Sequence, residues 1–60
     1  MMTDVEIVSR AIKIATKANN KTLVMAIRQD INVSMLSFED IVRSRGLKEM
    51  VASDAVKAKA

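Results

Sequence analysis

The chain contains 60 residues, half of them hydrophobic, and it has no cysteine, histidine, tyrosine or tryptophan. These absences exclude a cysteine nucleophile, a histidine acid or base and the side chains that usually bind zinc or iron. We therefore expect no catalysis, no cofactor and no metal site. The formal net charge of +3 favours acidic partners, but only mildly.

The length limits the architecture to one domain, residues 1–60. A domain of this size buries only about 60% of the surface that its unfolded chain exposes, and small domains usually gain stability from disulfides, a metal or a partner chain. Because the side chains for the first two are missing, we expect a homodimer. No signal peptide is apparent, and the longest apolar run, residues 23–27, is too short to cross a bilayer. We therefore expect a soluble, cytoplasmic protein.

Residues 3–19 predict a helix with one apolar half and one basic half. Thr3 and Glu6 have the spacing of a capping box, and Asn19 tolerates the left-handed conformation that ends helices. At about 100° per residue the apolar side chains fill half of the circumference, which is wider than one neighbouring helix covers. A second copy of the chain is expected to cover the rest. The predicted self-association residues are Val5, Ile7, Val8, Ile12, Ile14 and Ala15.

The opposite side of the same helix carries a row of cations. Arg10, Lys13 and Lys17 follow one another at helical spacing, and Lys21 extends the row if the helix continues that far. Like charges at this spacing cost a helix about 0.2–0.5 kcal/mol per pair. The row is either a binding surface for phosphates or an acidic protein, or a solvated face, and both interpretations stay open.

A second helix is predicted over residues 21–32. Its apolar side chains share one face at helical spacing: Leu23, Val24, Ile27 and Ile31. A strand over residues 22–28 is the alternative, but it would need a partner strand, and none is evident. Residues 32–36 then form a short connection, whose apolar side chains we expect to turn inward.

The remaining residues predict two more helical segments. Ser37 and Asp40 resemble a second capping arrangement, and Gly46 is a natural helix terminator because it accepts positive φ. Leu47 is expected to pack back on the helix that ends there. The inward-facing residues of the two segments are Phe38, Ile41, Val42, Met50 and Val51. The last helix is predicted over residues 47–56, and residues 53–60 have little to bury, so we expect that tail to fray.

Three internal methionines, Met25, Met35 and Met50, allow two interpretations. Flexible thioethers suit adaptable grooves that receive partner helices, but they also fill gaps in a core. Gap filling is favoured, because Phe38 is the only aromatic residue available for the core.

Residues 29–45 resemble, in their apolar spacing, the helix-turn-helix motif of DNA-binding proteins. Arg28 stands where that motif needs a small residue, and Asn32 stands where glycine is usual. Glu39 and Asp40 open the helix that would enter the groove, and phosphates would repel them. The cations that this segment offers to nucleic acid are Arg43, Arg45 and Lys48.

Together these patterns predict an all-α fold, a small bundle of three to four short helices completed by homodimerisation. Two functions fit it. The first is a non-enzymatic regulatory protein that docks on a protein partner. The alternative is a small DNA-binding regulator that uses the helix-turn-helix-like segment and the basic helix face. A protein partner is favoured over DNA, and neither a membrane nor a small-molecule substrate is expected.

Overall fold

The structure, a computed structural model, describes residues 2–33 and 35–59. Four helices follow one another: α1 (Asp4–Lys17), α2 (Lys21–Asn32), α3 (Phe38–Arg45) and α4 (Leu47–Lys59). No strand occurs within the described ranges, and residues 22–28 are helical. The predicted all-α fold, a small helical bundle, is confirmed.

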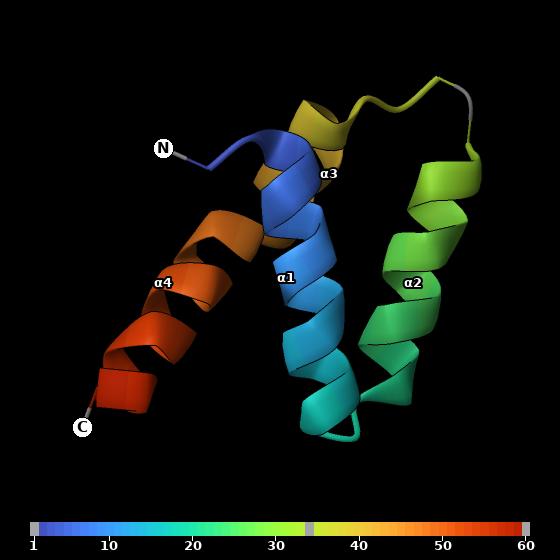
Figure 1. The fold of residues 1–60 in the computed structure, drawn as a ribbon. Helices are drawn as coiled ribbons and strands as arrows, with labels where there is room; N and C mark the ends of the chain where they lie inside the picture. The colour runs from blue at the N-terminus through green and yellow to red at the C-terminus, as the bar shows by residue number, and fades with distance from the viewer. Residues whose placement is uncertain (1, 34, 60) are drawn as a thin grey trace.

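Helix α1 lies in the middle of the bundle (Figure 1). It contacts each of the other three helices, with α2 on one side and α4 on the other, while α2 and α4 do not contact each other in the described part of the chain. All four helices contribute to the core around it: Ile7, Val8, Ala11, Ile27, Ile41, Val42, Leu47 and Val51. The wide apolar face of α1 is thus covered from two directions, as its width requires, by helices of the same chain.

The core is built from aliphatic side chains. Ile27, Ile41 and Leu47 are the largest fully buried residues, one each from α2, α3 and α4. Each contributes about 1.5–3 kcal/mol relative to an exposed position. On α1, the residues under the neighbouring helices include Ala11 and Ala15, both fully covered. Small side chains there let the outer helices approach the central one closely.

The turn between α1 and α2 is set by Asn19, as expected. Asn19 has φ 62°, the left-handed conformation that asparagine tolerates. The N–H of Asn20 donates to the carbonyl of Ala15 at 2.8 Å, and the N–H of Asn19 donates to that of Thr16 at 3.1 Å. These two bonds form a Schellman motif, which ends α1 at Lys17.

Two local signals also bound α3. The Ser37 hydroxyl accepts from the N–H of Asp40, and the Asp40 carboxylate accepts from the N–H of Ser37, both at 3.1 Å, so the predicted capping box is present. Gly46 ends the helix with φ 60° and ψ 36°. Leu47 directly follows it and is fully buried, as predicted.

The connection between α2 and α3 differs from the expectation. Its apolar side chains were expected to turn inward, but Val33, Met35 and Leu36 are exposed, and Ser34 lies outside the described residues. Phe38 is also partly outside the core, with 37% of its surface exposed. The reason is that the aliphatic residues of the four helices already fill the interior, and the connection passes over its surface.

Helix α4 continues beyond the predicted end at residue 56, to Lys59. The residues from Ala52 to Ala58 are exposed, which agrees with the small amount of apolar surface expected there. Ala60 lies outside the described residues, and the predicted fraying of residues 53–60 stays a prediction.

Candidate binding surfaces

The predicted self-association residues do not form one exposed surface. Ile7, Val8 and Ala15 are buried under the chain's own helices, and Ile12 and Ile14 are partly buried against the core. Val5 is the exposed member, at 55%. In this fold a second copy is therefore not needed to cover α1, and the buried members have no surface to offer to one.

Three of the predicted binding cations form ion pairs inside the chain. Arg10 pairs with Glu6 at 3.4 Å, and Arg43 pairs with Glu39 at 3.6 Å, in each case one helical turn away. Because these pairs are exposed, each is worth little stability. They nevertheless place a carboxylate beside each arginine, which reduces the attraction of that arginine for a phosphate.

Arg45 forms the third and tightest pair, with Asp30. Its Nε donates to Asp30 Oδ2 at 2.5 Å and its Nη2 donates to Oδ1 at 3.3 Å, a bidentate arrangement that joins α3 to α2. This hydrogen bonding holds the pKa of Asp30 below its ordinary value of 3.8 and raises the pKa of Arg45. Both α3 arginines are thus engaged by carboxylates, which weakens the hypothesis that α3 enters a DNA groove.

The lysines differ from the arginines. Within the described residues, none of the predicted lysines (Lys13, Lys17, Lys21 and Lys48) forms an ion pair. Because α1 ends at Lys17, the row does not run on to Lys21, which opens α2 across the turn. Lys48 lies apart from the others, at a hollow with Met2, Thr3, Asp4 and Ile7.

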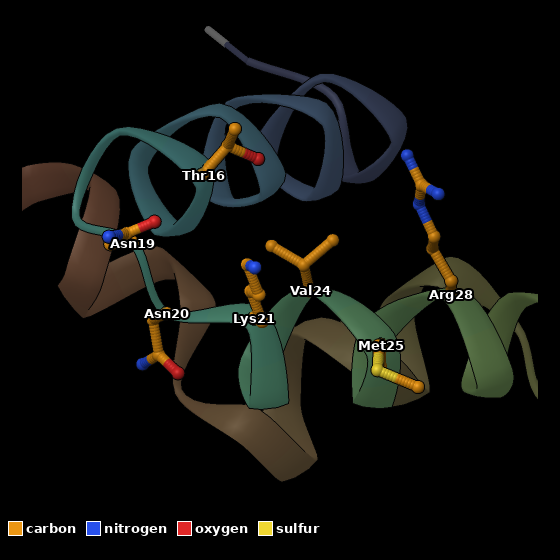
Figure 2. Close-up of a pocket in the computed structure, with 7 residues that line it drawn as sticks. All are labelled: Thr16, Asn19, Asn20, Lys21, Val24, Met25 and Arg28. Carbon is orange, nitrogen blue, oxygen red and sulfur yellow. The ribbon is translucent and has the colours of Figure 1, made fainter.

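Lys21 lies at a hollow of about 310 Å³ between the end of α1 and the first turns of α2. The lining residues are Thr16, Asn19, Asn20, Lys21, Val24, Met25 and Arg28 (Figure 2). Lys21, Val24 and Arg28 point from α2 toward α1, whereas Asn20 and Met25 point away from it. No carboxylate belongs to this lining among the described residues.

Arg28 is a candidate that the sequence analysis missed. It was considered only as a departure from the helix-turn-helix pattern. A signal was present, because Arg28 follows Lys21 by seven residues, which is about two helical turns and places both on one face of α2. Lys13 lies at a different hollow, between α1 and α4, whose lining includes Asp54.

Exposed apolar side chains gather at the opposite end. The described residues include nine large hydrophobic side chains that are exposed, and seven of them belong to segments at the end of the bundle where α1 begins, α2 ends and α3 begins (Figure 1). We name these seven the apolar end: Met2, Val5, Ile31, Val33, Met35, Leu36 and Phe38. The other two are Met25 and Val56.

The three internal methionines do not share one role. Met50 packs against the core, but Met25 and Met35 are exposed, so gap filling accounts for Met50 alone.

Within residues 2–33 and 35–59, no group of three or more acidic side chains is placed to hold a metal ion, and no helix is long and apolar enough to span a bilayer.

Comparisons with known proteins offer no relative from which to argue: no protein family, no curated protein and no solved structure matches the chain.

Proposed function

We propose that the protein is a non-enzymatic regulatory module that docks on a protein partner through its apolar end. The observation that carries the proposal is the gathering of seven of the nine exposed large hydrophobic side chains at that end. On soluble domains such side chains are usually scattered singly, and a concentration of them marks a contact surface.

The chemistry of the apolar end favours a protein over a membrane as its partner. Met35 is 90% exposed, and its flexible thioether can adapt to the surface of a partner. Helices that lie on anionic membranes carry free cations beside their apolar face. The arginines of α3, by contrast, are paired with Glu39 and Asp30. The expected partner therefore presents an apolar groove or helix, and the contact depends little on charge.

The homodimer remains part of the proposal, on a different surface from the one first expected. With the α1 face covered, the apolar end is the surface that a second copy would bury. Self-association and docking on the partner then compete for the same side chains. Sedimentation equilibrium of the isolated chain tests this, with interference detection because tyrosine and tryptophan are absent. Added partner should lower the dimer fraction.

The docking proposal is tested with two double variants of an immobilised chain. Val33→Ser with Leu36→Ser removes two apolar side chains from the apolar end, and Met25→Ser with Val56→Ser removes two exposed ones elsewhere. In nuclease-treated lysate the wild type and the second variant should capture the same partner. The first variant should bind the partner at least about tenfold more weakly. The two lost apolar contacts together contribute more than the 1.4 kcal/mol that corresponds to a factor of ten in affinity.

The same capture should persist when the salt concentration is raised, since apolar contacts are not screened. The proposal is wrong if both double variants lose the partner equally, or if neither does. Circular dichroism of each variant shows whether a loss of binding comes from the changed surface or from unfolding of the helices.

A further inference from the structure

We propose, on the basis of the docking function above, that the partner of the apolar end presents an apolar surface flanked by lysine or arginine side chains. Four exposed carboxylates lie beside the apolar side chains of that end. We name them the acidic rim: Asp4, Glu6, Glu39 and Asp40. An apolar surface alone accepts any apolar partner, whereas charges around it select among partners.

Acidic and basic residues are separated along this chain. Residues 2–9 and 29–42, which contain the whole apolar end, hold five of the seven acidic residues and none of the ten lysines and arginines. The fold gathers these acidic segments, because α1 begins, α2 ends and α3 begins at one end of the bundle (Figure 1). The fifth acidic residue, Asp30, is not part of the rim, because its side chain is only 17% exposed and binds Arg45.

The rim carboxylates flank the apolar side chains directly. Asp4 and Glu6 stand on either side of Val5 in the first turn of α1. The other two rim residues follow Phe38 in the first turn of α3. An acidic residue in the first turn stabilises its own helix, which accounts for part of this pattern. It does not account for the lack of lysine and arginine in the segments that carry the apolar end.

The chain's own arginines neutralise the rim only in part. Arg10 pairs with Glu6 and Arg43 pairs with Glu39, in each case from one turn further along the helix. The Glu6 and Glu39 side chains remain 48% and 64% exposed, so their carboxylates can accept a further cation. The other two rim residues form no ion pair with any residue that the structure describes.

Other occupants suit this end less well. Nucleic acid and anionic membranes carry phosphates, which the rim repels. A second copy bound about a two-fold axis would bring the same carboxylates face to face. Charges at the edge of an interface act mainly on the choice of partner and on the association rate, whereas apolar contacts mainly set the lifetime of the complex. Added salt should therefore slow docking without abolishing capture.

The test compares two labelled amphipathic peptides with the same leucine face, one with lysine and one with glutamate on the polar face. Stopped-flow fluorescence measures their association with the full chain at low salt. The lysine peptide should associate faster. The net charge of +3 would by itself favour the glutamate peptide, so this preference reports the acidic rim. Val33→Ser with Leu36→Ser should weaken the binding of both peptides.

A pair of double variants isolates the rim. Asp4→Asn with Glu39→Gln removes two rim charges and should slow association of the lysine peptide about fivefold, the effect of one contact between unit charges in water. Glu49→Gln with Asp54→Asn removes two exposed carboxylates of α4 and changes the net charge equally. This control should associate at nearly the wild-type rate. Circular dichroism checks that both variants keep their helical content.

Equal rates for the two peptides, or equal losses in the two double variants, would overturn the proposed charge of the partner and leave docking through the apolar residues in place. So would tighter binding to a second copy, to duplex DNA or to vesicles of anionic lipid than to the lysine peptide. Failure of both peptides to bind would overturn it as well, and capture from lysate then shows whether docking itself stands.

Discussion

Asp30 and Arg45 are 15 residues apart in the sequence, and their ion pair changes how the cations of this chain are interpreted. As a member of a cationic segment, Arg45 was a candidate for binding phosphate. In the fold its guanidinium lies against the Asp30 carboxylate and joins α3 to α2. A side chain that is already engaged by an anion has less to gain from a second one. Arg45 therefore has a structural role, the connection of α3 to α2.

This pair and the α3 cap lead to a prediction about acid stability. Hydrogen bonds from Arg45 lower the pKa of Asp30, and those from the Ser37 backbone and hydroxyl lower the pKa of Asp40, both from an ordinary value of 3.8. A carboxyl whose pKa is lower in the folded state stabilises the fold above its ordinary pKa. That stabilisation is lost as the pH falls through the lowered pKa. Urea midpoints measured by circular dichroism should therefore drop below about pH 4.

The variant Asp30→Asn isolates the contribution of the ion pair. It should be less stable than the wild type at neutral pH, and its urea midpoint should fall less on acidification. Asp54→Asn, at an exposed position of α4, is the control and should follow the wild-type curve. Parallel curves for wild type and Asp30→Asn would contradict the prediction.

At the scale of the helices, the starts of α1, α2 and α3 and the ends of α1 and α3 are set by residues within a few positions of them. Thr3, Asn20 and Ser37 each accept an N–H of the following helix, and Asn19 and Gly46 take the left-handed conformation that ends the preceding one. Such interactions are local, so they can be predicted from the sequence. Because the helices are short and the core is small, the interactions at each helix boundary contribute a noticeable part of the free energy of unfolding.

Substituting Gly46 tests the α3–α4 boundary. A Cβ at this position would meet only Glu49 Oε2 at 3.6 Å, so there is room for it, and the cost comes from φ +60°. Gly46→Ala should destabilise the fold by about 1–2 kcal/mol, the penalty of the left-handed conformation for an ordinary residue. Gly46→Asn should cost less, because asparagine tolerates this conformation. Thermal unfolding measures both, and equal losses would contradict this explanation.

The whole molecule is a thin, elongated bundle of 38 × 27 × 14 Å. Its apolar end lies where α1 begins and α2 ends (Figure 1). In our proposal this end docks on a protein.

The outward-facing residues mark where sequence reasoning failed. Phe38, Met35 and Val33 were placed inside because large apolar side chains usually are. Whether a residue near the end of a helix is covered depends on what lies beside it, and here aliphatic residues from other helices already occupy the interior. Arg28 was missed for a related reason, since its neighbours across the hollow belong to another helix.

The helical segments, the helix ends at Asn19 and Gly46, the α3 capping box and the need for cover on two sides of α1 follow from the sequence alone, because these depend on contacts within a few residues and on helical periodicity. The tertiary structure decided what supplies that cover. By placing α1 between α2 and α4, the chain buries Val8 and Ala15 itself. Seven of the nine exposed large apolar residues then lie at the end of the bundle where α1 begins, α2 ends and α3 begins. Periodicity shows which face of a helix must be buried, but it carries no information about which helix will lie against it.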